Sequence, residues 1–304
     1  MDFNLVDLVI LIRSDRNVGP GDLLLLLSRE FSNACRESVC RWPMRDCLCC
    51  SVRPACAWHH VFSQEISPDP EAVRCHQKPS LPFVFSVTLP VVEFDTYQVM
   101  ECRLVVVGRA LPYLGMLLDT VAAVLNRNNG NGNYRVVERA SRDCQGTLQP
   151  MDEVIDMENL VVLSARDIME RHSWECSQIG IRLLTPLSLR SEGRTVKKFD
   201  FRLFSCSLLR RVSALSYYYG ECELDYDFKS LSQQSAEIVC DDDHFGYQNI
   251  TGGNNRMCGI TGSGTFSGNF GGLMPFLALG TYFNAGKTAS FGMGRYELDV
   301  ANAL

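Results

Sequence analysis

Apolar residues in the first half of the chain follow two periods, one of two residues and one of three to four. Residues 3–12 alternate and are rich in Val, Ile and Leu, which predicts a strand. Gly19-Pro-Gly21 interrupts this pattern, and Asp22 is placed to cap a helix that runs to about Cys40. The same patterns predict strands at 82–89, 98–108 and 134–138 and a helix at 110–126. The order is βαββαβ, a ferredoxin-like unit with a long insertion after its first helix.

The second half of the chain repeats this order. The patterns predict strands at 179–189, 237–250, 258–269 and 294–300 and helices at 199–219 and 273–283. A helix, a glycine-rich turn and a strand follow one another at 110–138 and again at 271–300, which is an internal repeat. We therefore expect an α+β protein with tandem ferredoxin-like (RRM-like) domains. The expected domains are residues 1–148, with a cysteine-rich insertion at about 40–76, and residues 176–304, joined by an acidic, irregular linker at 149–175.

The composition is that of a globular protein long enough for two domains. The chain has 304 residues, of which 46% are hydrophobic and 21% are charged. No apolar run reaches the roughly 18 residues of a membrane span, and the leucine block 23–27 lacks the cleavage site of a signal peptide. The 14 cysteines, without a secretion signal, favour a reducing compartment. We expect a cytoplasmic protein without a membrane partner.

The formal net charge of −6 argues mildly against a surface coated with basic residues for nucleic acid. The charge is unevenly distributed, however. Between His244 and Leu298 the basic residues Arg256, Lys287 and Arg295 face a single acidic residue, Glu297. The acidic residues gather instead at Asp225, Asp227 and Asp241–Asp243.

A glycine-rich stretch near the carboxy terminus joins the last predicted helix to the last predicted strand. Glycines at 280, 286, 292 and 294 surround Lys287, Thr288 and Ser290. Glycine permits positive φ and a close approach of an anion to the backbone, and successive N–H groups with a lysine form an anion-binding concavity. The spacing does not match the G-x-x-x-x-G-K-[ST] motif of nucleotide-binding loops. The alternative is a flexible, exposed connection.

Four short motifs around this stretch resemble a known signature. They are Gly262-Ser-Gly264 through Gly268, Leu277-Ala-Leu-Gly280, Asn284-Ala-Gly-Lys287 and Ser290-Phe-Gly-Met-Gly-Arg-Tyr296. Together they resemble the carboxy-terminal signature of the CRISPR-associated RAMP proteins, and within them the endoribonucleases that process CRISPR precursor RNA. The resemblance implies two tandem ferredoxin-like domains and a glycine-rich loop that lies on RNA.

The RNA-binding residues follow from this loop and from nearby cations. One departure from the family pattern is Ile250-Thr-Gly-Gly253, which stands where many members carry Arg-Tyr-Ser. The role of that arginine is either unsupplied here or supplied by Arg256. Arg210 and Arg211 are expected on the exposed side of the helix 199–219, where they either contact phosphate or solubilise the helix. The expected RNA-binding residues are Gly286, Lys287, Thr288, Ser290, Gly292, Gly294, Arg295, Arg256, Arg210 and Arg211.

The predicted insertion carries the spacing Cys40-x6-Cys47-x-Cys49-Cys50-x5-Cys56. Four thiolates around a tetrahedral Zn²⁺ would staple such a segment, and an iron–sulfur cluster also takes four cysteines. The family resemblance favours Cys40, Cys47, Cys50 and Cys56 as ligands, in a branch of the family that has cysteines here. The alternative is a set of reduced cysteines in an irregular loop. A redox protein is disfavoured because this segment is not a strand–helix turn.

Metal-free RNA cleavage needs a base for the ribose 2′-hydroxyl, an acid for the leaving oxygen and a cation for the developing charge. In the resembling endonucleases the histidine lies in or just beyond the first helix, which here corresponds to His59 and His60. His60 is favoured over His59, and His244, which follows three aspartates, is the next candidate. Lys287 is the candidate for phosphate stabilisation.

Two functions follow from these residues. The first is a metal-independent endoribonuclease that cleaves CRISPR repeat RNA in the precursor transcript and leaves 2′,3′-cyclic phosphate and 5′-hydroxyl ends. The second is a catalytically inactive RAMP-type RNA-binding subunit of a CRISPR ribonucleoprotein complex, with other CRISPR-associated proteins as partners. No cofactor is expected for catalysis, and zinc or an iron–sulfur cluster would have a structural role.

Overall fold

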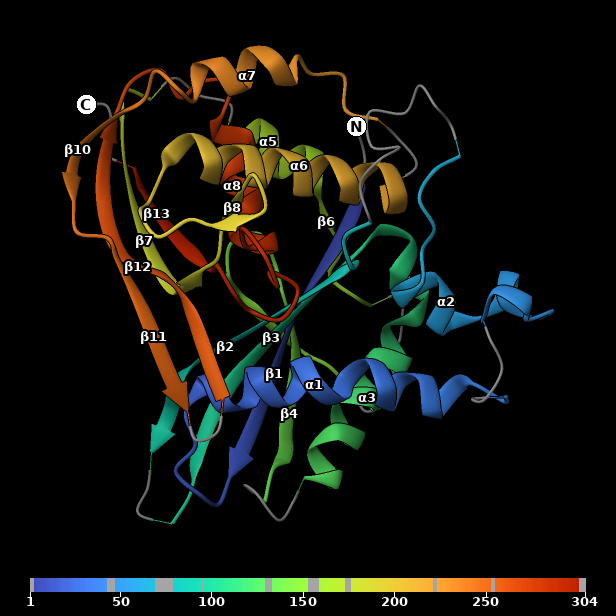
Figure 1. Cartoon of the computed structure of the whole chain (residues 1–304). Helices are drawn as coiled ribbons and strands as arrows, with labels where there is room; N and C mark the ends of the chain where they lie inside the picture. The colour runs from blue at the N-terminus through green and yellow to red at the C-terminus, as the bar shows by residue number, and fades with distance from the viewer. Residues whose placement is uncertain are drawn as a thin grey trace. The chain divides into compact units, whose positions relative to one another are not determined.

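The computed structural model divides the chain into two compact units (Figure 1). The amino-terminal unit is Leu5–Val162, and the carboxy-terminal unit is Leu163–Leu304 together with Met1–Asn4. The structure describes residues 3–42, 47–68, 79–93, 96–128, 133–152, 159–172, 176–220, 223–252 and 255–300.

The amino-terminal unit is built on an antiparallel sheet. Strand β1 (Asn4–Ser14) pairs with β3 (Gln98–Val107) on one side and with β4 (Arg135–Arg142) on the other. Strand β2 (Phe83–Glu93) continues the sheet beyond β3, and β5 (Leu148–Pro150) continues it beyond β4. With α1 (Pro20–Val39) and α3 (Leu114–Arg127) this is the βαββαβ order, and the strand order β2-β3-β1-β4 is that of a ferredoxin-like unit.

Helix α1 begins differently from the prediction. Gly19 is its N-cap, and Asp22 is the third helical residue, whose carboxylate accepts the Gly19 N–H at 3.0 Å. Asp22 therefore completes the cap from inside the helix, as acidic residues do near a helix N-terminus. Phe31 of the same helix is fully buried, and its ring lies 4.9 Å from that of Phe85 and 5.4 Å from that of Phe83. These aromatic contacts fix α1 against the sheet.

The insertion after α1 contains two short 3-10 helices, η1 (Cys47–Cys49) and η2 (Arg53–Ala55), and one α-helix, α2 (Ala57–Phe62). Two aromatic residues hold α2 against the core. Trp58 donates its indole N–H to the Ser32 carbonyl of α1 at 3.1 Å, and the Phe62 ring lies 5.6 Å from that of Phe83. The position of the insertion, after the first helix, is as predicted.

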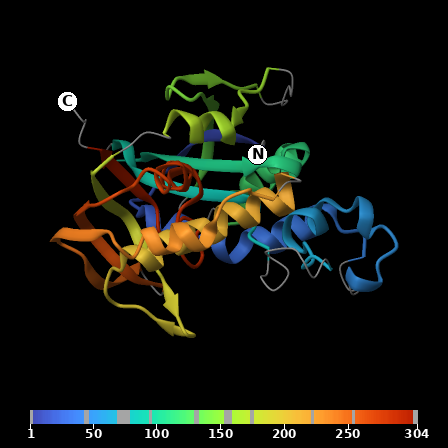
Figure 2. The ribbon, with the colours of Figure 1, turned by 90° about the horizontal axis from the view of Figure 1, so that it is seen from above.

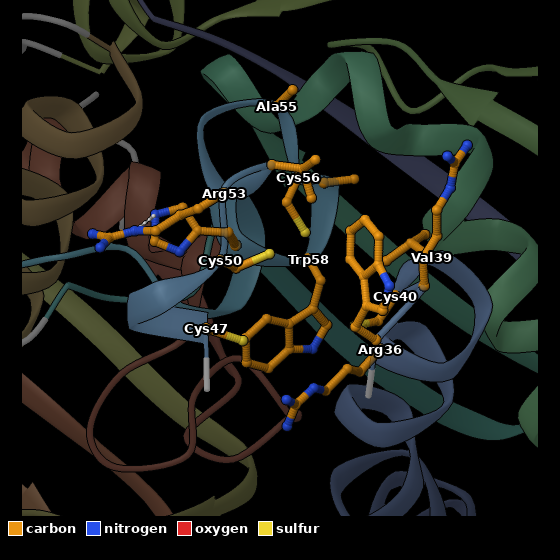
Figure 3. A pocket seen from close by; sticks show the side chains of 14 residues that line it. Arg36, Val39, Cys40, Cys47, Cys50, Arg53, Ala55, Cys56 and Trp58 are labelled. Atoms are coloured by element: carbon orange, nitrogen blue, oxygen red, sulfur yellow. Dashed lines mark hydrogen bonds between the residues drawn. The ribbon is translucent and has the colours of Figure 1, made fainter. Parts of the chain in front are cut away.

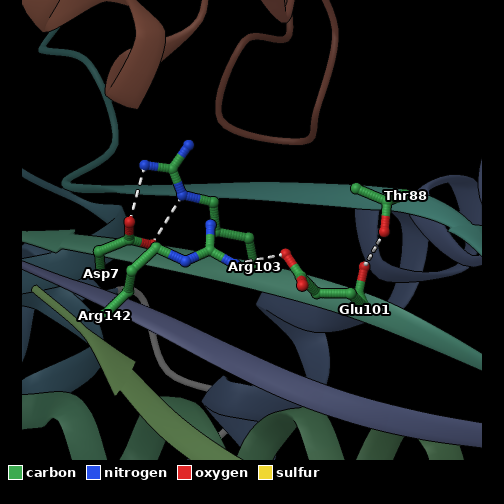
Figure 4. A network of polar contacts seen from close by, with 5 residues as sticks. All are labelled: Asp7, Thr88, Glu101, Arg103 and Arg142. Atoms are coloured by element: carbon green, nitrogen blue, oxygen red, sulfur yellow. Dashed lines mark hydrogen bonds and ion pairs between the residues drawn. The ribbon is translucent and has the colours of Figure 1, made fainter. Parts of the chain in front are cut away.

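A buried ion pair ties the strands of this sheet together (Figure 4). Arg103 of β3 donates to both carboxylate oxygens of Asp7 of β1, at 2.7 and 2.8 Å, and Asp7 is 1% exposed. Arg142 of β4 donates to the Glu101 carboxylate at 2.8 Å. A bidentate arginine satisfies a buried carboxylate well, so removing one partner would leave an uncompensated charge.

The stretch Gly108–Arg127 is the one described helical segment apolar and long enough to pass a membrane-span test. It consists of the 3-10 helix η3 (Gly108–Tyr113) followed by α3. The apolar side of α3, with Leu114, Leu117 and Val121, is buried, and α3 packs on α1. The apolar side of α3 is therefore covered within the amino-terminal unit itself.

The predicted linker is partly regular. Strand β6 (Leu163–Ser164) and helix α5 (Ala165–Arg171) lie within it, and Ser164 caps α5 by accepting the Asp167 N–H at 3.2 Å. Ile168 and Met169 are buried, and α5 packs against the last helix of the carboxy-terminal unit. The prediction of an irregular segment was wrong over this helix, because a short apolar face and a serine cap suffice for two turns.

The carboxy-terminal unit repeats the ferredoxin-like order. Its sheet runs β10-β12-β7-β13, with β11 also paired to β12. Its strands are β7 (Gln178–Leu187), β10 (Val239–Asp243), β11 (Gly246–Gly252), β12 (Asn255–Ser267) and β13 (Tyr296–Val300), and its long helices are α6 (Phe201–Gly220) and α8 (Met274–Phe283). The prediction of tandem ferredoxin-like domains is therefore confirmed.

The structure of this unit differs from the prediction in one divided strand and in several short added elements. The expected strand 237–250 is divided into β10 and β11 at His244 and Phe245, where the regular pairing with β12 is interrupted although the His244 N–H still donates to the Ser263 carbonyl. The additions are a hairpin of β8 (Arg190–Ser191) and β9 (Arg194–Thr195), and a short helix α7 (Phe228–Gln234).

Gly280 shows how closely helix α8 approaches strand β13. A Cβ atom at Gly280 would lie 2.1 Å from the Tyr296 hydroxyl, which donates to the Leu277 carbonyl at 2.6 Å. Only a residue without a side chain fits at this crossing. Gly280 therefore serves helix–strand packing.

Candidate active site and glycine-rich loop

The two candidate histidines lie on helix α2 of the amino-terminal unit. The His60 ring stacks on that of Tyr113, with 5.7 Å between centroids and 14° between planes. His60 Nε2 lies 2.8 Å from the Pro54 carbonyl oxygen. Because a carbonyl can only accept, Nε2 carries a proton, and in the neutral ring Nδ1 keeps its lone pair. His60 thus has the form of a positioned base.

His59 has the opposite arrangement. Arg53 Nε donates to His59 Nε2 at 3.2 Å, so the lone pair of that nitrogen is occupied, and Arg53 also pairs with Glu65. His59 Nδ1 is buried without a hydrogen-bond partner among the described residues. The pKa of His59 is lowered, first by burial and then by the nearby charges of Arg53 and His60. His59 is therefore a neutral ring whose basic nitrogen already has a donor.

Tyr113, at the end of η3, was missed by sequence reasoning. Its stacking on His60 arises because η3 and α2 come together in the fold, although about fifty residues separate them in the chain. Nothing in the local pattern of the sequence indicates that contact.

The remaining histidines have other surroundings. His172 Nδ1 bonds to the Ile168 carbonyl of its own helix at 2.7 Å. His244 Nε2 lies 2.9 Å from the Asp242 carboxylate, and both side chains are largely exposed. His76 lies outside the described residues. His244 belongs to the carboxy-terminal unit, whereas His59 and His60 belong to the amino-terminal unit.

The four predicted cysteine ligands line one cavity of the amino-terminal unit, with a volume of about 390 Å³ (Figure 3). Trp58 lines the same cavity, and Arg36 lies over its ring at 5.2 Å. Among the described residues, no three Cys, His, Asp or Glu side chains are arranged to hold a metal ion. The residues in question are Cys40, Cys47, Cys50 and Cys56, which are all free thiols; Cys49 is not part of the lining.

The glycine-rich loop, residues 284–295, uses several of its N–H groups internally. The Gly286 N–H donates to Ser207 Oγ at 3.0 Å, that of Lys287 to the Ser188 carbonyl at 2.8 Å, and that of Gly294 to the Pro186 carbonyl at 3.0 Å. These three groups are therefore not available to an anion, contrary to the predicted concavity.

Gly286 and Gly294 also lie in close contact with neighbouring backbone atoms, which leave no room for a side chain. Their φ angles are 78° and 67°, and a Cβ atom would lie 2.5 Å from the Ser188 oxygen at Gly286 and 2.0 Å from the Ala285 oxygen at Gly294. Gly292 has a φ of 85° and is buried. These glycines therefore allow the tight backbone conformation of the loop and do not make its backbone accessible.

Arg211 anchors the loop from beneath. It donates from Nε to the Phe283 carbonyl at 2.7 Å and from a terminal nitrogen to Ser290 Oγ at 3.0 Å. Burial lowers the pKa of its guanidinium to about 10. The expectation that Arg211 lies on the exposed side of its helix was wrong, because the turn of the helix places it inward while its neighbour Arg210 is exposed.

The other predicted RNA contacts differ in their exposure. Lys287 and Thr288 are exposed at the tip of the loop, whereas Ser290 is buried beneath it. Arg295 is half-buried, and its N–H donates to Thr185 Oγ1 at 2.8 Å. Arg256 lies in β12, but its side chain is outside the described part of the structure. Among the members of the set whose side chains the structure describes, Lys287, Thr288 and Arg210 are the fully exposed ones.

Comparisons with known proteins fit this fold. A family model described as CRISPR-associated endoribonuclease Cas6 matches residues 181–296, and a second model, described as an N-terminal domain, matches residues 29–163. No curated protein sequence matches the chain significantly.

Solved Cas6 structures share the fold over nearly the whole chain. A Cas6 product complex is 14% identical, with a TM-score of 0.60, and the match covers 98% of this chain and 100% of that one. Thermus thermophilus Cas6 is 15% identical, with a TM-score of 0.55 and coverage of 98% and 99%. A chain of a partial Cas6-RT-Cas1–Cas2 complex is 13% identical, with a TM-score of 0.56, and covers 99% of this chain and 47% of its own length. Residues 181–296 thus match the CRISPR-associated Cas6 endoribonuclease family, and nearly the whole chain has the fold of solved Cas6 structures.

Proposed function

We propose that this protein binds CRISPR repeat RNA in the precursor transcript and cleaves it once, without a metal, to leave a 2′,3′-cyclic phosphate and a 5′-hydroxyl. The observation that carries this proposal is the geometry of His60, whose ring is held by the Pro54 carbonyl and Tyr113 with one nitrogen left as a base. Processing of CRISPR RNA is the work of its family.

The proposed reaction begins at His60 Nδ1, which accepts the proton of the ribose 2′-hydroxyl. The 2′-oxygen then forms a bond to the adjacent phosphorus, and the bond from phosphorus to the 5′-oxygen breaks. The 5′-oxygen takes a proton as it leaves, and the phenol of Tyr113, stacked on His60, is a candidate donor. The Pro54 carbonyl accepts a hydrogen bond from Nε2–H and so stabilises the imidazolium that forms.

Lys287 supplies charge in this proposal. It is an exposed cation on the glycine-rich loop of the carboxy-terminal unit and would neutralise charge on the phosphate oxygens. Thr288 and Arg210 are the accompanying RNA contacts. Ser290, which is buried, and Arg211, which is partly buried, would act indirectly by holding the loop.

The cysteine set is proposed as a structural site for zinc or an iron–sulfur cluster, in a branch of the family with cysteines in this insertion. Its four thiols line one cavity, although they are not arranged as ligands in the present geometry. Helix α2 begins at Ala57, directly after Cys56, and carries both histidines. A group that fixed Cys56 would therefore also fix the start of the helix that bears His60.

The second function, an inactive RNA-binding subunit, is less favoured because His60 is positioned as a base. Assembly with other CRISPR-associated proteins in the cytoplasm remains compatible with cleavage. A similar chain occurs in a Cas6-RT-Cas1–Cas2 complex.

The test is incubation of the protein with repeat RNA from a neighbouring CRISPR locus in EDTA, followed by mass spectrometry of the product ends. We expect cleavage at one position with a cyclic phosphate, and no cleavage when that nucleotide alone is 2′-deoxy. Cleavage of the 2′-deoxy RNA, or loss of activity in EDTA that added metal restores, would contradict the mechanism.

A further inference from the structure

The β8–β9 hairpin of the carboxy-terminal unit is a projection closed by a tight turn. Its two turn residues, Glu192 and Gly193, have φ angles of 49° and 78°, the left-handed values of a tight two-residue hairpin turn. Arg190 pairs with Thr195 and Ser191 with Arg194. An added Cβ at Gly193 would meet nothing within 4 Å, so the tip is open. Figure 2 shows the hairpin, in yellow, extending from the body of its unit.

The base of the hairpin is tied to the sheet. Leu189 is 3% exposed and accepts the Val196 N–H at 3.0 Å. Beyond it, Lys197 Nζ lies 5.7 Å from the centre of the Tyr247 ring of β11. The hairpin is thus held at its root and free at its tip, which pre-organises the side chains along it.

The hairpin carries an exposed positive charge that nothing in the described structure neutralises. The exposed cations are Arg190, Arg194, Lys197 and Lys198, and the one acidic residue between 188 and 198 is Glu192. None of these cations forms an ion pair with a described acidic side chain, whereas Arg182 of the same unit is paired with Glu297.

Lys287 adds a fifth cation at the root of the hairpin. Its N–H donates to the carbonyl of Ser188, the second residue before β8, at 2.8 Å. The exposed tip of the glycine-rich loop is therefore joined to the hairpin by a backbone hydrogen bond. The hairpin and the loop form one basic surface, which we define as Arg190, Arg194, Lys197, Lys198 and Lys287.

We propose that this basic surface binds the phosphate backbone of the RNA, with the hairpin extending the contact beyond Lys287. The proposal rests on the proposed function for the identity of the polyanion. In a chain with a net charge of −6, affinity for a polyanion has to come from a local cationic surface. Guanidinium groups match phosphate oxygens in a two-pronged geometry, and successive residues of a ribbon face opposite ways, so Arg190 and Arg194 can meet phosphates on both sides.

The experiment replaces Arg190, Arg194, Lys197 and Lys198 by alanine and leaves the turn Glu192-Gly193 intact. Binding of repeat RNA, made non-cleavable by one 2′-deoxy nucleotide, is measured between about 50 and 300 mM salt. Each lost phosphate contact lowers the slope of log K against log salt by about 0.7 for a single strand, so we expect a fall of about two to three units. Affinity at low salt should fall by about tenfold or more.

The matched control is Arg182→Ala, which removes an exposed but paired arginine and should leave the slope unchanged. Equal melting temperatures of the proteins would exclude misfolding. An unchanged slope in the fourfold variant would overturn the proposal, as would a fall equal to that of Arg182→Ala.

An unrelated single-stranded RNA serves as a second probe, because phosphate contacts are not sequence-specific. One outcome is that the wild-type protein neither cleaves the repeat nor binds it more tightly than the unrelated RNA, while the fourfold variant has a smaller salt slope on both RNAs. In that case the proposed function fails and the hairpin surface stands. If the protein cleaves the repeat and the variant binds both RNAs with the wild-type slope, the hairpin proposal alone fails.

Discussion

Arg53 donates from Nε to Nε2 of His59 across 3.2 Å, and this bond distinguishes two adjacent histidines on one short helix. The guanidinium occupies the nitrogen of His59 that would otherwise act as a base. His60, one residue later, points its Nε2 to a carbonyl instead and keeps Nδ1 as an acceptor. Two side chains of the same type thus have opposite chemical roles, set by one donor and one acceptor from the same 3-10 helix, Arg53 and Pro54.

The first prediction concerns His60. Replacement by alanine should slow single-turnover cleavage by about 10² to 10⁴-fold, the usual range for a lost general base, while the Kd for RNA changes little. His59→Ala should have a smaller effect, since the lone pair of its Nε2 is already bound by Arg53. The measurement is single-turnover cleavage at saturating protein. Wild-type rates in the double His59/His60 variant would defeat the assignment and direct attention to His244.

The second prediction concerns pH. The pKa of His59 is lowered in the folded protein, so as pH falls through the ordinary histidine value of about 6.5 the unfolded chain binds a proton first. The corresponding stability is present at higher pH and is lost as pH falls toward the folded pKa of His59. Arg53→Ala should raise that pKa and reduce the loss.

NMR titration of the His59 ring measures this directly. Arg41→Ala is the control, since Arg41 lines the same cavity without a bond to His59 among the described residues. An unchanged His59 pKa in the Arg53 variant would show that Arg53 does not contribute to the lowered pKa.

Much of the fold could be predicted because alternation and helical periodicity report burial directly. The strand at 3–12 and the helix at 273–283 correspond to β1 and α8 within two residues at each end. Short elements were missed for the same reason. The strands of the β8–β9 hairpin are two residues each, too short to show a period, although Glu192-Gly193 is itself a turn signal.

The site was less predictable because its features depend on contacts between distant segments. The sequence indicated His59 and His60 but not that Tyr113 stacks on one of them. Arg210 and Arg211 were both expected on the exposed side of the helix, because their adjacency in the sequence does not show which of them faces inward. It also assumed bare N–H groups in the glycine-rich loop, which the carbonyls of Pro186 and Ser188 in fact accept.

The third prediction separates the structural role of the loop glycines from RNA contact. Gly294→Ala should destabilise the protein by about 2 kcal/mol or more, since it combines a left-handed φ with a Cβ placed 2.0 Å from a carbonyl oxygen. Gly193→Ala is the matched control, because Gly193 also has a left-handed φ but open space around it. It should cost about 1 kcal/mol. Urea unfolding without RNA measures both, and equal losses would place the strain of Gly294 in its backbone angle alone.

The last prediction concerns the cysteine cavity. If the four thiols hold a structural metal, protein purified without added metal should contain about one equivalent of zinc or iron, because tetrathiolate sites bind tightly at neutral pH. Elemental analysis together with thiol titration measures this.

Cys50→Ala should then lower the melting temperature more than it lowers the rate of cleavage by folded protein, since the metal would act by stabilising the insertion rather than at the phosphate. Cys49→Ala is the control, as Cys49 is exposed and does not line the cavity. Less than about a tenth of an equivalent of zinc and iron together, with all thiols reacting freely, would contradict the metal site. In that case the insertion is held by its own packing, with the four cysteines as free thiols that line one cavity with Trp58.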